Sequence, residues 1–211
     1  MSLEKIIIPA IIARTQEELD EKLSKVADYF KLIQLDIMDD KFVPNSSLNF
    51  DFKIPKLKCK FEAHLMMENP KNWIDNFSDK VNMILVHSES VDNYHSIIDL
   101  ARKKNKQIGF VLNPESKVSK ISDILDEIDQ VLIMTVNPGF YGNPFLPKIL
   151  EKISVLRKIK PNLNIEVDGG ITDKTIKSVK NAGANMFVSG SYIVKSQNIK
   201  ESINKLTKEI N

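Results

Sequence analysis

Short apolar runs alternate with longer amphipathic segments along all 211 residues, and this alternation predicts an α/β fold. The apolar runs are nearly continuous, as in parallel strands that are covered on both faces. Eight strand–helix units, the second with a loop and a short segment in place of its helix, follow one another without a linker or a low-complexity stretch between them. In a chain of this length they favour a closed (β/α)8 barrel, the TIM barrel, folded as a single domain over residues 1–211.

The expected strands are short and rich in Ile, Val and Leu. In chain order they are Ile6–Pro9, Leu32–Ile37, Phe61–Met66, Met83–His87, Ile108–Leu112, Val131–Val136, Asn164–Val167 and Met186–Ser189. An open, doubly wound sheet is the competing arrangement. It is disfavoured because no GxGxxG motif follows the first strand, where Pro9-Ala10-Ile11 stands instead.

The expected helices carry apolar residues three or four positions apart, as Leu19, Leu23 and Val26 do in the first of them. Pro70 suits the first turn of the second helix. The polar stretch Asp39–Asn49 is expected to be a loop. The helices predicted by this spacing are Glu17–Tyr29, Pro70–Phe77, Val91–Lys104, Val118–Glu127, Pro147–Ile159, Asp173–Asn181 and Ile199–Ile210.

Charge and cysteine content exclude several classes of function. The 30 basic and 28 acidic side chains give a net charge of +2 with no block of one sign, so nucleic acid is not expected as a partner. No run approaches the 18 or so apolar residues of a membrane span. The single Cys59 rules out an intrachain disulfide and a thiolate zinc site, and suits a reducing compartment. We therefore expect a cytoplasmic protein.

Polar residues at the carboxyl ends of the strands are the candidates for chemistry, because barrel active sites lie at that rim. The period of two points Gln34, Asp36 and Met38 inward on one strand, and His64 and Met66 inward on the next. A carboxylate facing the barrel interior must be paired, protonated or metal-bound. Asp36 can thus be a salt-bridged structural residue or a functional one, and His64 a packing residue or a metal ligand.

Glycine is scarce, with 7 in the chain, yet five of the seven fall in three loops at the same predicted rim. These five are Gly139, Gly142, Gly169, Gly170 and Gly190. Glycine lets backbone N–H groups approach an anion closely, and the loops after the last two strands form the usual phosphate site of such barrels. The three loops together predict a phosphate-binding mouth.

Two carboxylates, Asp36 and Asp168, would face each other across this mouth. One can remove a proton next to a carbonyl while the other returns a proton to the opposite face, which inverts a carbon centre. A metal ion at His64 would stabilise the negative charge that builds on oxygen. The residues alone therefore suggest a reaction that inverts a carbon centre next to a carbonyl in a substrate that carries a phosphate.

Several motifs, spread over essentially the whole chain, resemble those of the ribulose-phosphate 3-epimerase family. They are Leu35-Asp36-Ile37-Met38-Asp39 with Phe42-Val43-Pro44-Asn45, His64-Leu65-Met66 with Asn69-Pro70, Met134-Thr135-Val136-Asn137-Pro138-Gly139-Phe140, Val167-Asp168-Gly169-Gly170-Ile171 and Gly190-Ser191. The resemblance implies a barrel enzyme, an isomerase of carbohydrate metabolism in the pentose phosphate pathway, that interconverts D-ribulose 5-phosphate and D-xylulose 5-phosphate. It implies that Asp36 and Asp168 are the acid–base pair.

The resemblance further implies a divalent transition metal, Zn, Fe, Mn or Co, held by Asp36, His64 and Asp168 together with the residue at position 34. It implies that methionines line the pocket and that backbone groups of the glycine loops hold the substrate. The lining residues would be Met38, Met66 and Met134, and the substrate-binding residues His64, Gly139, Phe140, Tyr141, Gly142, Gly169, Gly170, Gly190 and Ser191. It also suggests a homo-oligomer.

The chain departs from the family pattern at three places. Gln34 stands where the family has a histidine ligand, Ala10 where it usually has serine, and Asp40-Lys41 where it commonly has Gly-His. An amide oxygen is a poorer ligand than imidazole for a metal such as zinc, so we expect weakened, altered or absent metal binding. Two alternatives follow: a 3-epimerase for another ketose phosphate, such as D-allulose 6-phosphate, or a non-catalytic phosphosugar-binding relative.

Overall fold

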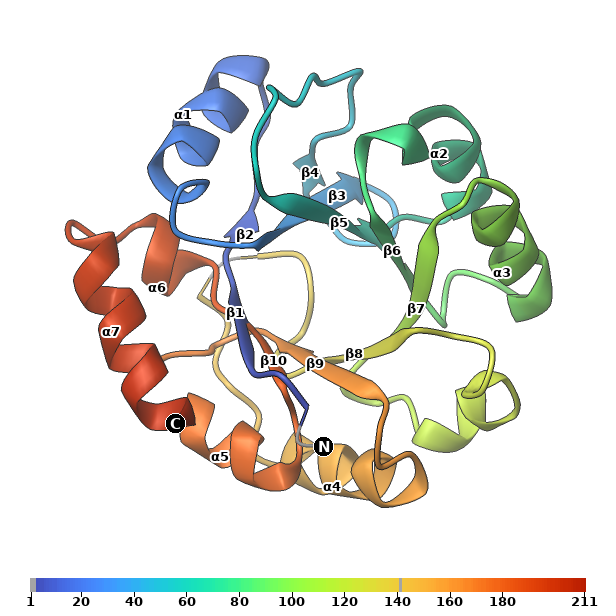
Figure 1. Ribbon diagram of the computed structural model, residues 1–211. Coiled ribbons are helices and arrows are strands. Elements are labelled where there is room, and N and C mark those ends of the chain that lie inside the picture. The colour runs from blue at the N-terminus through green and yellow to red at the C-terminus, as the bar shows by residue number, and fades with distance from the viewer. Residues whose placement is uncertain (1–2, 141) are drawn as a thin grey trace.

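The computed structural model describes residues 3–140 and 142–211, and its strands form a ring surrounded by helices (Figure 1). The predicted TIM barrel is confirmed. The sheet order is β1-β10-β9-β8-β7-β6-β5-β3-β2, with every neighbouring pair on this path parallel. The strands are β1 (Ile6–Ile8), β2 (Ala10–Ile11), β3 (Leu32–Asp39), β4 (Ser46–Ser47), β5 (Lys60–Met66), β6 (Met83–His87), β7 (Gln107–Leu112), β8 (Gln130–Met134), β9 (Asn164–Asp168) and β10 (Met186–Val188).

The first strand closes the ring by changing partners at Pro9. Its first half, β1, pairs with β10, and its second half, β2, pairs with β3. Proline has no N–H to donate, but its carbonyl accepts a hydrogen bond from the Gln34 N–H at 2.9 Å. The strand expected over Ile6–Pro9 is therefore two short strands on either side of that residue.

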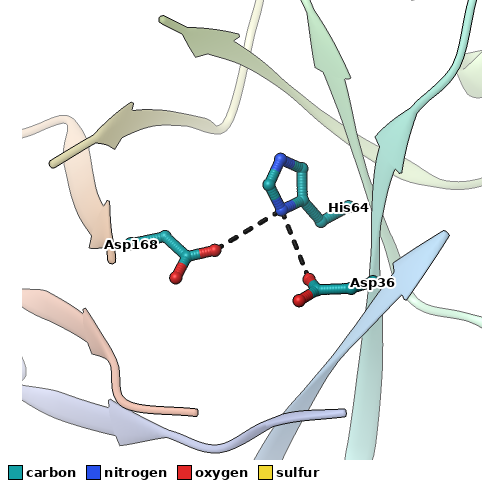
Figure 2. A group of neighbouring side chains, drawn as sticks. All are labelled: Asp36, His64 and Asp168. Atoms are coloured by element: carbon teal, nitrogen blue, oxygen red, sulfur yellow. Dashed lines mark ion pairs between the residues drawn. The ribbon is translucent and has the colours of Figure 1, made fainter. Parts of the chain in front are cut away.

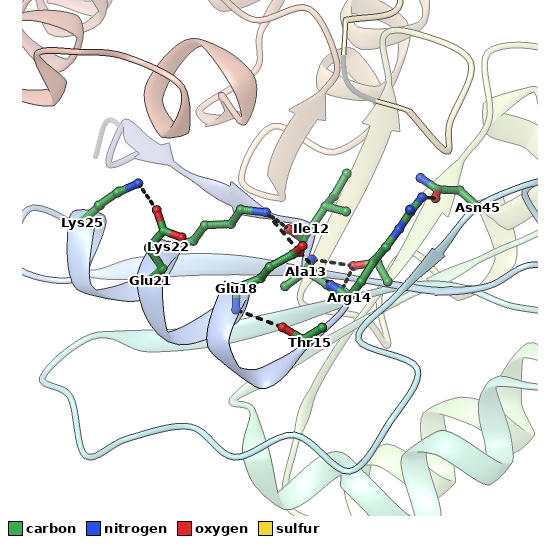
Figure 3. A network of polar contacts seen from close by, with 10 residues as sticks. Ile12, Ala13, Arg14, Thr15, Glu18, Glu21, Lys22, Lys25 and Asn45 are labelled. Atoms are coloured by element: carbon green, nitrogen blue, oxygen red, sulfur yellow. Dashed lines mark hydrogen bonds and ion pairs between the residues drawn. The ribbon is translucent and has the colours of Figure 1, made fainter.

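Helices cover the outside of the barrel. They are α1 (Gln16–Val26), α2 (Pro70–Phe77), α3 (Tyr94–Lys103), α4 (Ile149–Ile159), α5 (Ile176–Ala182), α6 (Ser191–Val194) and α7 (Ile199–Ile210), with 3-10 turns η1 (Ser78–Lys80) and η2 (Val118–Ile124). At the start of α1 the Thr15 hydroxyl accepts from the Glu18 N–H, and the Glu18 carboxylate accepts from the Arg14 N–H (Figure 3). This capping arrangement satisfies donors that the first turn leaves free.

Several expected segments differ from the structure. Helix α1 ends at Val26 instead of Tyr29, and α3 begins at Tyr94 instead of Val91. The segment expected as a helix over Val118–Glu127 is the 3-10 helix η2, whose buried Val118, Ile121 and Ile124 recur every three residues, the period of that helix. Helix α5 begins at Ile176 instead of Asp173, because the preceding residues form a turn. The loop expected over Asp39–Asn49 contains the short strand β4, which pairs antiparallel with β3.

The hydrophobic core lies mainly between the barrel and the helices. On β3 the outward-facing Ile33, Leu35 and Ile37 belong to this outer layer and are fully buried. The barrel interior holds smaller apolar clusters, such as the one that contains Leu85, Leu132 and Met134. Polar side chains share the interior with these clusters. Because they are buried, each of them needs a hydrogen-bond partner within the protein. No helix among the described residues is long and apolar enough to cross a bilayer.

Candidate active site

Two neighbouring strands and one across the barrel bring the predicted polar side chains together. Asp36 on β3 lies in register with His64 on β5, and Asp168 ends β9. The His64 Nδ1 atom lies 3.3 Å from Asp36 Oδ1 and 3.5 Å from Asp168 Oδ2 (Figure 2). His64 is fully buried, while the side chains of Asp36 and Asp168 are 8% and 14% exposed. The two carboxylates thus meet at one imidazole nitrogen.

Gln34 lies deeper than these three residues and touches all of them. Its Nε2 donates to Asp36 Oδ1 at 2.8 Å and to Asp168 Oδ2 at 2.8 Å, and lies 3.4 Å from His64 Nδ1. Its Oε1 is buried and has no hydrogen-bond partner among the described residues. The amide therefore bridges the two carboxylates and leaves its own oxygen unsatisfied.

Burial and the paired carboxylates control protonation here. Burial alone would lower the pKa of His64, but its hydrogen bonds with Asp168 and Asp36 raise that pKa to about 9. Burial raises the pKa of Asp36, an effect that the hydrogen bond with His64 opposes and the charge of Asp168 reinforces. Without another cation, the His64 ring carries the positive charge that the carboxylates require.

A divalent metal ion fits the same donor set. One ligand atom each of Asp36, His64 and Asp168 lie within 4.8 Å of one another. Two carboxylate oxygens and one imidazole nitrogen suit a transition ion. The orphaned Gln34 Oε1 becomes a fourth donor if the amide turns over, which exchanges Nε2 for Oε1 at the centre of the group. The residues therefore fit a metal at three positions, with a fourth that depends on the amide orientation.

The cleft above these side chains is lined by residues from many of the βα loops. It includes predicted pocket residues and also Ala10 of β2 and Ile12, which directly follows β2. Among the residues expected to contact substrate or line the pocket, the cleft contains Met38, His64, Met66, Met134, Gly139, Phe140, Gly142, Gly169, Gly170, Gly190 and Ser191. Tyr141, also expected to bind substrate, lies outside the described residues. Gln34 is not part of this lining, because it is covered by the carboxylates.

Side-chain hydrogen bonds hold the glycine loops in place. The Asn45 side chain donates to the Gly139 carbonyl at 2.7 Å, and Arg14 donates to the Asn45 side-chain oxygen at 3.1 Å (Figure 3). The Thr135 hydroxyl donates to the carbonyls of Asp168 and Gly169. Gly169 has a φ of +113°, and a Cβ there would overlap Val136. The loops are thus tied back to the barrel, with glycine required at Gly169.

A second buried histidine lies behind His64. His87 of β6 is fully buried, and its ring packs against the His64 ring with centroids 5.0 Å apart. Burial lowers the pKa of His87 to about 4. Glu89, two residues on, has a pKa of about 2, because hydrogen bonds with His87 and Ser116 outweigh the effect of burial. The inward period of two along β6 was the signal for His87, but nothing in the sequence indicated its contact with His64.

Buried acids also occupy the barrel interior on the side away from the cleft. Glu62 and Glu166 are both fully buried, and Gln130 donates to Glu166 at 2.6 Å. Burial raises the pKa of Glu62 to about 8 and that of Glu166 well above its usual value. The strand alternation places both side chains inward, but nothing in the sequence indicated that these two acidic residues would lie close together in the barrel.

Solved structures with the same fold include a 3-hexulose-6-phosphate synthase and an orotidine 5'-monophosphate decarboxylase from Methanocaldococcus jannaschii. The first has a TM-score of 0.69 at 19% identity and covers 98% of this chain and 100% of its own. The second has a TM-score of 0.65 at 15% identity and covers 98% of both chains. At such identities the likeness shows the barrel fold alone.

Sequence comparisons identify the family. The model of the ribulose-phosphate 3-epimerase family matches residues 6–194. A ribulose-phosphate 3-epimerase of Schizosaccharomyces pombe is 32% identical over 97% of this chain and 93% of its own. Another, of Bacillus subtilis, is 35% identical over 82% of this chain and 84% of its own. The chain therefore belongs to the ribulose-phosphate 3-epimerase family and is an isomerase of the epimerase type.

Proposed function

We propose that this chain, as one barrel domain over residues 1–211, interconverts D-ribulose 5-phosphate and D-xylulose 5-phosphate by two-base proton transfer at C3. The observation that carries the proposal is the convergence of Asp36 and Asp168 on one buried imidazole beneath the glycine loops. The names of the relatives support the choice of substrate. The protein acts in the cytoplasm as a homo-oligomer in this proposal.

The two carboxylates perform the proton transfers. One removes the C3 proton as the carbonyl at C2 becomes an enediolate, and the other, protonated, delivers a proton to the opposite face of C3. After one turnover the carboxylate that accepted is protonated and its partner is not, so protons must exchange with water before the next turnover in the same direction. Both directions are served by the same pair, as a reversible epimerisation requires.

The remaining residues bind and orient the substrate. The backbone of the loops at Gly139–Gly142, Gly169-Gly170 and Gly190-Ser191 holds the phosphate, while Met38, Met66 and Met134 form the apolar wall. His64, held between the aspartates, orients them and contacts the substrate. A divalent transition ion bound by Asp36, His64 and Asp168 would supply Lewis-acid stabilisation of the charge that builds on the substrate oxygens.

The substrate is tested by side-by-side assays of D-ribulose 5-phosphate and D-allulose 6-phosphate, each with and without added Zn²⁺, Mn²⁺, Co²⁺ or Fe²⁺. The proposal expects a higher kcat/KM for the pentulose phosphate. A higher value for the hexulose phosphate would contradict the proposed substrate and favour the alternative epimerase, which the departure at Asp40-Lys41 motivates. Turnover of neither, with binding of both, would favour the non-catalytic relative.

A further inference from the structure

The buried side chains behind His64 form a line of contacts that leads away from the cleft. His64 Nε2 lies 2.9 Å from His87 Nε2. The other nitrogen of His87, Nδ1, lies 3.4 Å from Glu89 Oε2. Both rings are completely buried. None of the roles assigned above to the epimerase residues uses His87 or Glu89.

Glu89 is fixed in place by hydrogen bonds to one of its oxygens. Oε1 accepts from the hydroxyls of Ser88 and Ser116 and from the Asn113 N–H, which is 3.3 Å away. These donors favour an ionised carboxylate. Oε2 faces His87 in the 3.4 Å ion-pair contact, and apart from this contact neither Oε2 nor His87 Nδ1 has a polar partner among the described residues. The only polar group that faces Glu89 Oε2 among the described residues is therefore His87 Nδ1, and the reverse also holds.

These contacts determine where the protons lie. A carboxylate only accepts, so the His87 nitrogen that faces Glu89 must carry the proton. His64 faces two carboxylates and His87 only one, so His64 is the better placed of the two rings to bear a positive charge. With its one hydrogen on Nδ1, the His87 ring has a lone pair and no hydrogen at Nε2. The 2.9 Å contact between the two Nε2 atoms needs one hydrogen, and it must come from His64. The same hydrogen-bond direction holds whether His64 is cationic or neutral.

We propose that Glu89 and His87 are positioning residues that keep a proton on His64 Nε2, so that His64 Nδ1 is the nitrogen offered to a cation between Asp36 and Asp168. Metal-ligating histidines commonly donate their second N–H to such a partner, which orients the ring and strengthens the ligand. With the opposite arrangement, Nδ1 would hold the only proton of the neutral ring, and a metal would have to displace it. The metal consequence rests on the proposed function, whereas the proton positions do not.

The proton positions can be read directly. In ¹⁵N-labelled, metal-free protein, long-range ¹H–¹⁵N correlation spectra distinguish the protonation of each ring nitrogen in the three histidines. We expect His87 to be protonated at Nδ1 only, and His64 to be protonated at Nε2. After Zn²⁺ is added, His64 should keep its Nε2 proton. His95, on the exposed surface of α3, serves as the reference that should not change.

A second measurement tests the consequence for metal affinity. Glu89→Gln removes the acceptor charge at nearly constant size. Glu115→Gln is the matched control, because Glu115 pairs with Lys148 on an exposed part of the neighbouring loop. Titration calorimetry with Zn²⁺ should show affinity about 10–100-fold weaker in Glu89→Gln, the usual effect of losing such a partner, and unchanged in Glu115→Gln.

The inference is overturned if His87 carries its proton on Nε2 in the unaltered protein, or if folded Glu89→Gln binds Zn²⁺ as tightly as the unaltered protein. The spectrum of the unaltered protein decides the matter even if Glu89→Gln does not fold. If the unaltered protein binds no Zn²⁺, the proposed metal is refuted, while the His87 spectrum still tests the proton positions. Failure of the proposed function and failure of this inference are thus separate results.

Discussion

The metal affinity of this site depends most on the side chain of Gln34. In the present arrangement its amide nitrogen donates to both carboxylates and takes a position that a cation would otherwise occupy. A metal must therefore displace or turn this amide as it binds. An amide oxygen is a weaker ligand than imidazole for borderline metals, so the bond that it forms to the metal offsets little of the free energy needed to move the amide.

Replacing Gln34 by histidine should strengthen metal binding. We expect the Gln34→His variant to bind Zn²⁺ about tenfold more tightly or better, equivalent to about 1.4 kcal/mol, as measured by calorimetry. Gln107→His, the same substitution at the exposed start of β7, is the control and should leave the affinity unchanged. Equal affinity in Gln34→His and the unaltered protein would show that position 34 does not reach the metal.

Removing either carboxylate should abolish most of the activity. Asp36→Asn and Asp168→Asn keep the size of the side chain but lose its base, and we expect kcat to fall by about 10²–10⁴-fold in each. Asp126→Asn, in which an exposed ion pair with Lys160 is lost, should retain full activity. A steady-state assay checks this, and near-normal kcat in either active-site variant would rule out the two-base scheme.

At this scale the sequence predicted which residues face inward but not how they pair. The strand alternation placed Gln34, Asp36 and His64 on the interior, and the structure has them there. The nitrogen-to-nitrogen contact of His64 and His87 depends on barrel curvature and on the rotamers of both rings. Neither is encoded in the local pattern, so this pairing became visible only in the structure.

At the scale of elements, the glycine loops differ in how strongly each depends on glycine. Gly169 combines a positive φ of +113° with close approach to Val136, whereas Gly142, with a φ of +89°, has open space around a Cβ. A left-handed conformation costs a residue with a side chain about 1–2 kcal/mol. At position 169 a side chain would also overlap Val136, which adds to that cost. This position directly follows Asp168.

The Gly169→Ala and Gly142→Ala variants should therefore differ. We expect Gly169→Ala to raise KM and lower kcat together, because the overlap moves the loop that follows Asp168, and to destabilise the fold by more than about 2 kcal/mol. Gly142→Ala should lose no more than about 1–2 kcal/mol. Thermal unfolding and steady-state kinetics measure both, and equal losses in the two variants would contradict the steric argument.

The sequence predicted strands better than it predicted the elements between them. Continuous apolar runs such as Ile108–Leu112 allowed little choice, since a parallel strand buried on both faces must be apolar throughout. The segment at Val118–Ile124 was expected to be an α-helix, because spacings of three residues satisfy both helix types over a short stretch. The pairing of β4 with β3 could not be predicted, because two-residue strands have no periodicity.

At the scale of the whole molecule, the barrel carries buried acid on both sides of its centre. Asp36 and Asp168 open toward the cleft, while Glu62 and Glu166 lie on the other side and are sealed from solvent. The first strand, which switches partners at Pro9, closes the ring around both groups. We expect Glu62 and Glu166 to make the free energy of unfolding depend on pH, whereas Asp36 and Asp168 are available for proton transfer to the substrate.

Glu62 should make the protein less stable as the pH rises. Its native pKa of about 8 lies above its usual value of 4.5, so the native state binds more protons than the unfolded chain between those values. The free energy of unfolding therefore falls as the pH increases through this window. In Glu62→Gln the decline should be smaller by about 1–4 kcal/mol between pH 5 and pH 9.

Urea unfolding at the two pH values measures this change. The exposed Glu68→Gln serves as the control and should keep the pH dependence of the unaltered protein. If Glu62→Gln declines as steeply as the unaltered protein, the Glu62 carboxyl titrates no differently in the native and unfolded states, and the electrostatic account of the barrel interior is wrong.

If Asp36 and Asp168 move the C3 proton of a pentulose phosphate, this proton must exchange with solvent during turnover. D-ribulose 5-phosphate is incubated with the protein in heavy water, with and without Zn²⁺, and followed by proton NMR. We expect replacement of the C3 proton by deuterium together with the appearance of D-xylulose 5-phosphate, and we expect no D-xylulose 5-phosphate with Asp168→Asn. A folded, metal-supplied protein that leaves the C3 proton in place would contradict this expectation.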